Sequence, residues 1–207
     1  MTTTGKQIFT TLESDGTLTV EVATSEFPEP KGNQVLVKME AAPINPSDLA
    51  LLFGQADLDN ADYSEGKIVA KMPEPFNSGS KGRHGQRMPV GNEGAGEVIA
   101  TGESDAAKAL MGKRVSCVPG TAYAEYAIAD ANMCLPLGDI SSKDGASAFV
   151  NPMTAAAFVT GALASMGAGF AGMTSATSAS GELTSSFLMD KTPLSRPSVS
   201  TTKSLSV

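Results

Sequence analysis

An asparagine held between two prolines is the first feature of this 207-residue chain that could do chemistry. Asn45 lies between Pro43 and Pro46. Each proline fixes its own φ angle and restricts the residue before it to extended backbone. A rigidly held amide can direct both a hydrogen-bond donor and an acceptor. Two interpretations remain open at this point: Asn45 orients a ligand, or it braces its own turn.

A second candidate is the glycine-rich segment at residues 88–102, which runs into a short apolar stretch. Glycine is used where the backbone needs a positive φ angle or a close approach to another group. The segment therefore predicts a loop pressed against a ligand or a second sheet, and a glycine-rich hairpin without a ligand is the alternative. Glu93 within this loop either tunes a site or braces the backbone. The three glycines in question are Gly91, Gly94 and Gly96.

The segment around Asn45 reads Ala-Pro-Ile-Asn-Pro-Ser-Asp at residues 42–48. After it and the glycine-rich segment, a third segment follows at residues 151–155, with the sequence Asn-Pro-Met-Thr-Ala. In this order and at these separations, the three segments resemble the GroES-like catalytic domain of the medium-chain dehydrogenase/reductase superfamily. The resemblance covers roughly the first 160 residues. It is strongest to the zinc-free branch of quinone reductases and 2-enoyl-thioester reductases.

The resemblance implies a mainly β fold with short helices, a GroES-like partly open β-barrel, followed by a low-complexity tail. It also implies hydride transfer from NADPH or NADH to an activated double bond or carbonyl, with the cofactor carrying the chemistry. The expected partners are a small-molecule substrate (a quinone, an enone or an enoyl thioester) and a second copy of the chain in a homodimer. By resemblance, Asn45 faces the nicotinamide and the substrate as the catalytic and cofactor-binding residue, and Asn151 and Thr154 contact the cofactor.

No catalytic metal is expected. The zinc-dependent relatives carry a Cys and a His on two of these loops, where this sequence has Asn45 and Asn92. Neither amide is a ligand that catalytic zinc prefers. The single histidine, His84, is expected to be a solvated loop residue. Cys117 and Cys134 form no Cys-x-x-Cys pair, so they are expected to be small buried apolar side chains in a reducing compartment.

One departure from the enoyl reductases weakens that narrower assignment. In enoyl-thioester reductases a proton-donating tyrosine follows the short helix that comes after the Asn-Pro-Ser-Asp segment. This sequence has Ala56 at that position, and Tyr63 comes several residues later. A generic quinone or alkene reductase is therefore equally compatible with the sequence. The alternative from a different class is a non-catalytic GroES-like module, or a degenerate fragment, that does not bind cofactor by itself.

Composition limits the other functions. The net charge of -7 argues against nucleic acid and against an anionic membrane surface as partners. Residues 152–180 carry no charge, but Gly, Ala, Ser and Thr insert weakly into a bilayer, so no membrane span is expected. The first residues show no targeting pattern, so the cytoplasm is the expected location.

The elements that must position these residues are mostly strands. Residues 6–11 and 17–22 are predicted to form a hairpin through Asp15-Gly16, and residues 34–40 a further strand. Ser47 or Asp48 is expected to cap a short helix over residues 49–53. Residues 55–87 are polar and are expected to form a long loop or lobe.

Further along the chain, two strands are expected at residues 112–118 and 121–129, with a turn at Pro119-Gly120. Tyr123 and Tyr126 would then point to opposite faces of one strand, with one ring in the core and one on the surface. A helix is expected to begin at residues 151–152, with Pro152 at its first position.

The sequence divides into two parts. Residues 1–159 are expected to form the substrate-side domain, and residues 160–207 a Gly/Ala/Ser/Thr-rich tail that is disordered or a remnant of the missing cofactor domain. The tail contains Gly-Ala-Gly-Phe-Ala-Gly at residues 167–172, but no convincing strand precedes it. A dinucleotide-binding fingerprint requires that strand, so we interpret the match as chance composition.

Overall fold

The structure is a computed structural model that describes residues 2–160, with side chains described as far as Ala156. The expected tail and its glycine motif therefore lie outside the described residues, apart from Thr160.

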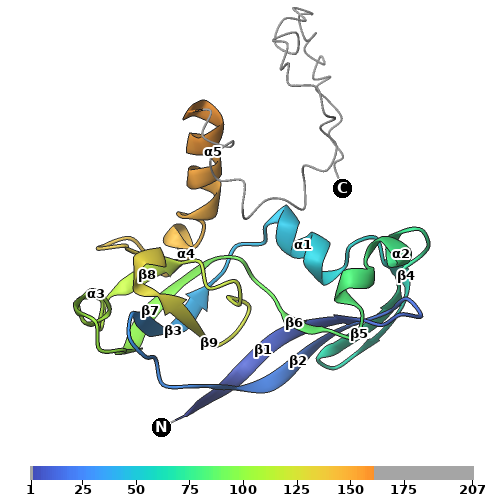
Figure 1. The fold of residues 1–207 in the computed structure, drawn as a ribbon, viewed down its shortest axis with the longest axis horizontal. Helices are drawn as coiled ribbons and strands as arrows, with labels where there is room; N and C mark the ends of the chain where they lie inside the picture. The colour runs from blue at the N-terminus through green and yellow to red at the C-terminus, as the bar shows by residue number, and fades with distance from the viewer. Residues whose placement is uncertain (1, 161–207) are drawn as a thin grey trace, which may run out of the picture. The chain divides into compact units, whose positions relative to one another are not determined.

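Two five-stranded antiparallel sheets make up most of the described residues (Figure 1). The first sheet has the order β4-β5-β2-β1-β6 and the second β10-β8-β7-β3-β9. The described strands form no closed barrel, and the predicted mainly β class with short helices is confirmed. The strands are β1 Thr3–Leu12, β2 Thr17–Phe27, β3 Gln34–Ala41, β4 Asp57–Ser64, β5 Lys67–Lys71, β6 Arg87–Pro89, β7 Gly94–Thr101, β8 Arg114–Cys117, β9 Tyr126–Asp130 and β10 Cys134–Pro136.

Short helices connect these strands. Figure 1 shows α4 beside β7 and β8, which it contacts. None of the helices in the described part of the chain combines the length and apolar character needed to cross a bilayer. The helices are α1 Pro46–Leu52, α2 Phe76–Gly79, α3 Asp105–Lys108, α4 Ser142–Gly145 and α5 Val150–Thr160, with 3-10 turns η1 Lys81–Arg83 and η2 Ala131–Met133.

The predicted hairpin at Asp15-Gly16 is present between β1 and β2. Gly16 has a φ angle of 80°, which favours glycine. The Asp15 carboxylate accepts hydrogen bonds from the Thr17 N–H and hydroxyl, both at 2.9 Å, and from Lys71 Nζ at 3.1 Å. These bonds favour the charged carboxylate and lower the pKa of Asp15 to about 2. The turn is thus held by its own side chains.

Of the two forms expected for residues 55–87, a long loop or a lobe, the long loop is wrong. The segment forms β4, β5, α2, η1 and β6. In the first sheet β5 pairs with β2, and β4 lies at the edge. The β4 strand is almost entirely polar, and its pairing with β5 shifts register between Asp57 and Asp62. Its backbone pairing, rather than an apolar face, keeps it in the sheet, so side-chain patterning gave no signal.

The prediction for His84 is also wrong. The side chain is half-buried, and its Nε2 lies 3.0 Å from Asn77 Oδ1 and 3.2 Å from the Asn77 carbonyl oxygen. His84 also forms an isolated β-bridge with Leu12 at the end of β1, so it connects the α2 segment to that strand.

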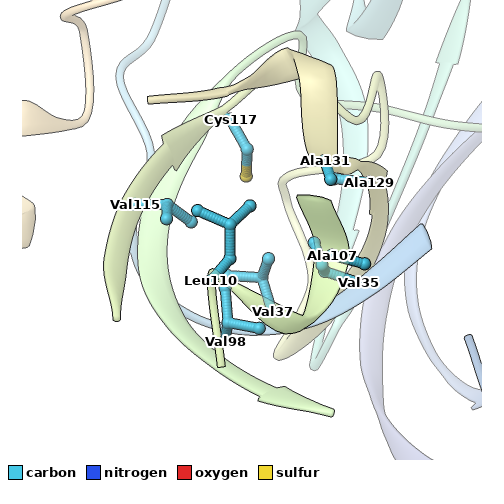
Figure 2. Close-up of a cluster of buried hydrophobic side chains, with 9 residues drawn as sticks. All are labelled: Val35, Val37, Val98, Ala107, Leu110, Val115, Cys117, Ala129 and Ala131. Atoms are coloured by element: carbon cyan, nitrogen blue, oxygen red, sulfur yellow. The ribbon is translucent and has the colours of Figure 1, made fainter. Parts of the chain in front are cut away.

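The larger apolar core lies on one face of the second sheet (Figure 2). Alternate residues of β3, β7 and β8 point into it, as expected for strands with one buried face. The segment containing α3 closes the cluster with Leu110 and Ala107 (Figure 2). Burial of each of these valine side chains stabilises the fold by about 1.5–3 kcal/mol relative to an exposed side chain. The strand residues are Val35, Val37, Val98, Val115, Cys117 and Ala129.

The two sheets meet along β1. Ile8 N–H donates to the Tyr123 carbonyl oxygen, and Glu125 N–H donates to that of Lys6, both at 2.9 Å. The segment before β9 therefore runs beside β1, and only Tyr126–Asp130 forms the strand expected at residues 121–129. Because Tyr123 lies outside the strand, the expected division of the two tyrosines between core and surface is wrong, and both rings are half-buried.

Candidate functional site

The loop before α1 is fixed by a reciprocal set of backbone and side-chain contacts. Asn45 is the N-cap of α1, with φ -88° and ψ 151°, and Pro46 occupies the first helical position. The Asn45 N–H donates to Asp48 Oδ2 at 3.2 Å. The helix thus begins three residues earlier than predicted, and its cap is Asn45 rather than Ser47 or Asp48.

Asp48 also holds the glycine-rich loop. Its Oδ1 accepts from the Asn92 N–H at 2.9 Å, and Asn92 Nδ2 donates to Ser47 Oγ at 2.8 Å. The Asp48 side chain is only 2% exposed. One buried carboxylate therefore joins the two loops that the sequence singled out.

The Asn45 side chain bonds to residues from two other segments. Its Nδ2 donates to Glu93 Oε1 at 3.2 Å, and its Oδ1 accepts from Asn151 Nδ2 at 3.3 Å. Asn45 is 5% exposed. The structure thus brings the predicted residues Asn45 and Asn151 into direct contact, with Asn92 one residue from Glu93.

Glu93 is the hub of this arrangement. It is 0% exposed, and its Oε2 accepts from the Val150 N–H at 2.8 Å and the Phe149 N–H at 3.3 Å. The first N–H groups of a helix have no partner within the helix, and a carboxylate there is stabilised by the helix dipole. Glu93 therefore anchors the start of α5 to the loop before α1. We refer to Asn45, Asp48, Glu93 and Asn151 as the carboxylate–amide cluster.

The glycines of the loop contact the chain's own backbone. Gly91 has a φ angle of 102°, and a Cβ there would lie 2.9 Å from the Ala122 nitrogen. A Cβ on Gly94 would lie 2.8 Å from the Ala41 carbonyl oxygen. The close approach predicted from the glycines is thus to neighbouring protein segments.

Tyr123 borders the cluster, and sequence reasoning missed it. Its hydroxyl donates to the Pro43 carbonyl oxygen at 2.9 Å. Burial, followed by the negative charge of Asp48, raises the pKa of Tyr123 to about 12. Tyr126 instead packs on Phe27, with ring centroids 5.7 Å apart. No spacing in the sequence could separate these roles, because they depend on where β9 begins.

Thr154 lies one turn beyond Asn151 on α5. Its hydroxyl donates to the Val150 carbonyl oxygen at 2.8 Å, so the hydroxyl proton is already bonded within the helix. The oxygen lone pairs of Thr154 and the exposed amide of Asn151 remain as groups that a ligand could bond.

The cluster does not fit a catalytic zinc ion. Each carboxylate oxygen of Asp48 and Glu93 already accepts an N–H, and the Asn45 and Asn92 amides offer neither thiolate nor imidazole. Within residues 2–160, no group of three or more His, Cys, Asp or Glu side chains could hold a metal ion.

A surface hollow of about 600 Å³ lies away from this cluster. Residues of β7, β8 and β10 and of the turns beside them line it, among them Glu97, Lys113 and Arg114. A second hollow of about 290 Å³ borders Tyr123 between β1 and residues 123–125. The chemistry of the cluster, rather than the size of a cavity, therefore identifies the candidate site.

The alcohol dehydrogenase GroES-like domain family matches residues 31–139, which is more than half of the chain. The chain belongs to this family. The match covers α1, the glycine-rich loop and the second sheet, and ends before α5. The expected GroES-like fold and the resemblance to medium-chain dehydrogenases/reductases are confirmed.

Prostaglandin reductase-3 of Mus musculus is 26% identical over 116 residues, which are 56% of this chain and 24% of that protein. A protein named as an NADPH:quinone reductase from Mesorhizobium loti is 29% identical, with a TM-score of 0.54 over 79% of this chain and 45% of that one. A second protein so named, from Bacillus thuringiensis, is 26% identical, with a TM-score of 0.54 over 78% and 42%. The chain therefore spans less than half the length of these relatives.

Proposed function

We propose that this GroES-like domain is the substrate-side part of an NAD(P)H-dependent, zinc-independent oxidoreductase of the quinone or enoyl reductase type. The observation that supports the proposal is the buried carboxylate–amide cluster around Asn45. By resemblance, Asn45 and the neighbouring Asn92 stand where zinc-dependent relatives have a metal ligand. Relatives named as NADPH:quinone reductases share this domain fold. When bound, the nicotinamide cofactor would supply the hydride.

The residues of this chain would bind and orient the nicotinamide end of the cofactor. The Asn151 amide and the Thr154 oxygen, one turn apart on α5, would bond polar groups of the ring. Asn45 would border the ring and the substrate, and its bond to Asn151 fixes the direction of the second amide. Glu93 holds Asn45 through a side-chain hydrogen bond and holds Asn151 by anchoring the start of α5.

The fit is limited to that end of the cofactor. Within residues 2–160, no Gly-x-Gly-x-x-Gly segment leads from a strand into a helix to bind a pyrophosphate. The substrate would be a small quinone, enone or enoyl thioester. We further propose that the protein is cytoplasmic and acts as a homodimer.

A non-catalytic GroES-like module is the second candidate, and one observation favours it. The Asn45 amide already bonds protein groups at both ends and is almost fully buried. A cluster that only stabilises the domain would have the same contacts.

A binding and turnover experiment separates the two candidates. The full chain is titrated with NADPH and NADH, and cofactor oxidation is followed with a panel of quinones and enones. The proposal expects saturable binding, weakened roughly tenfold in Asn151→Ala by loss of a hydrogen bond. Asn132→Ala is the matched control, because the exposed Asn132 lies on η2 outside the cluster. A folded chain that neither binds nor oxidises either cofactor would support the non-catalytic module.

A further inference from the structure

The two cysteines lie directly opposite each other on neighbouring strands. Cys117 ends β8 and Cys134 begins β10, and the two are paired in the antiparallel register. Both are free thiols in the structure, and Cys134 packs against the core cluster that contains Cys117.

The pair occupies a non-hydrogen-bonded position of the ladder. Val118 N–H donates to the Met133 carbonyl oxygen at 3.3 Å, and Leu137 N–H donates to that of Arg114 at 3.0 Å. Hydrogen-bonded and non-hydrogen-bonded pairs alternate along an antiparallel ladder. Residues 118 and 133 form a hydrogen-bonded pair at one end of the ladder, and residues 114 and 137 form one at the other end. By this alternation, Cys117 and Cys134 form a non-hydrogen-bonded pair, the kind in which facing side chains are closest.

That geometry is compatible with a disulfide. Facing Cα atoms at such a position are about 4.5 Å apart, which lies within the range that a disulfide spans. The backbone spacing typical of such a pair therefore suits a disulfide.

The environments of the two thiols differ in the way that a redox pair requires. Cys117 is 0% exposed, and its hydrogen bond to Cys134 together with burial raises the pKa of its thiol. Cys134 is half-buried, and the bond from Cys117 lowers the pKa of its thiol against the opposing effects of burial and of the negative charge of Asp130. The thiolate is the nucleophile, so Cys134 would react first and Cys117 second.

We propose that Cys117 and Cys134 form a reversible cross-strand disulfide when the chain meets a hydroperoxide. The Cys134 thiolate attacks a peroxide oxygen, the O–O bond breaks, and hydroxide leaves to give a sulfenic acid. The Cys117 sulfur then attacks the Cys134 sulfur, the S–O bond breaks, and the thiol proton leaves with the hydroxide as water. Two thiols and one hydrogen peroxide thus give one disulfide and two waters.

Oxidation would fasten the edge of the second sheet beside the candidate site. β10 has three residues and pairs only with β8 among the described strands, and Cys117 also faces Gly94, the neighbour of Glu93. The disulfide would therefore hold β10 on β8 next to the loop that carries the hub carboxylate. This chemistry is independent of hydride transfer.

The digestion pattern of the chain allows a direct test. No Lys or Arg lies between Arg114 and Lys143, so trypsin leaves both cysteines in one peptide. Glu125 is the only glutamate between them, and cleavage after it separates the cysteines into two peptides. After hydrogen peroxide treatment of the full chain, we expect a monomer about 2 Da lighter, in which those peptides remain linked until dithiothreitol is added.

Two variants test the order of reaction. In Cys117→Ala, dimedone should trap a sulfenic acid on Cys134, whereas in Cys134→Ala the buried Cys117 should remain unlabelled. The oxidised wild type should melt roughly 6–12 °C higher than the reduced form. Unchanged thiols, overoxidation of Cys134 without linkage, linkage between chains, or an unchanged melting temperature would each overturn the proposal.

Discussion

Glu93 offers the sharpest perturbation of the candidate site. Its buried carboxylate accepts three N–H donors, from Asn45 Nδ2 at 3.2 Å, Val150 at 2.8 Å and Phe149 at 3.3 Å. Glu93→Ala would leave these donors without an acceptor. An unsatisfied buried donor costs about 1–3 kcal/mol, and partial hydration of the α5 end reduces the total, so we expect a loss of about 3–5 kcal/mol in unfolding free energy.

Glu93→Gln should cost less, about 1–2 kcal/mol, for a specific reason. The glutamine oxygen would face the two backbone N–H groups, and its NH₂ would face Asn45. Asn45 could then present its oxygen after an amide flip, and Asn151 could flip in turn because its side chain is exposed. The variant loses the charge but keeps a satisfied network.

Urea unfolding measured by circular dichroism gives these free energies. Glu97→Gln is the matched control, since Glu97 is exposed on β7 close to Glu93, and its effect should stay within about 0.5 kcal/mol. Hydrogen exchange should also speed up at the Val150 and Phe149 amides in Glu93→Ala. A Glu93→Ala protein as stable as the control, with these amides still protected, would refute the reasoning.

Three further predictions concern titration, backbone and metal. Because its pKa is raised to about 12, Tyr123 should titrate near pH 12 in an ultraviolet titration. Because this folded pKa lies above the unfolded value of about 10, its stabilisation is complete below pH 10 and is lost as the pH rises toward 12. Tyr123→Phe should abolish the transition near pH 12 and lower the unfolding free energy at pH 8 by about 1 kcal/mol. If the transition persists in this variant, it belongs to another residue. Gly91→Ala should cost more than about 2 kcal/mol, because its φ angle is 102° and the new Cβ would press on the backbone of residues 122–123. Gly82→Ala, where a Cβ meets nothing within 4 Å, should be near neutral, and equal effects would contradict the account. Elemental analysis after zinc incubation and desalting should find less than stoichiometric zinc, and one bound ion per chain would be the contrary result.

The first sheet shows what local sequence predicts well. Asp15-Gly16 supplies both the turn conformation and the side-chain oxygens that fix it, so the β1–β2 hairpin was predictable. The β4–β5 hairpin was not, since β4 carries only Leu58 and Tyr63 as large apolar residues and depends on pairing with β5.

The site shows a similar division. That the loop before α1 and the glycine-rich loop lie together followed from the resemblance. The start of α1 at Pro46 was readable from an asparagine before a proline but was missed in favour of later caps. The role of Glu93 depends on contacts across more than 40 positions of the chain, to Asn45 and Val150, and no local pattern encodes such a bond.

A nuclear magnetic resonance titration with NADPH tests most directly whether the carboxylate–amide cluster borders a nicotinamide. Side-chain amide signals of the full chain report on each asparagine separately. The account predicts saturable shifts for Asn45 and Asn151 and for the Val150 backbone amide, with Asn60 on β4 unchanged. Shifts confined to residues remote from the cluster, or none at saturating NADPH, would contradict it.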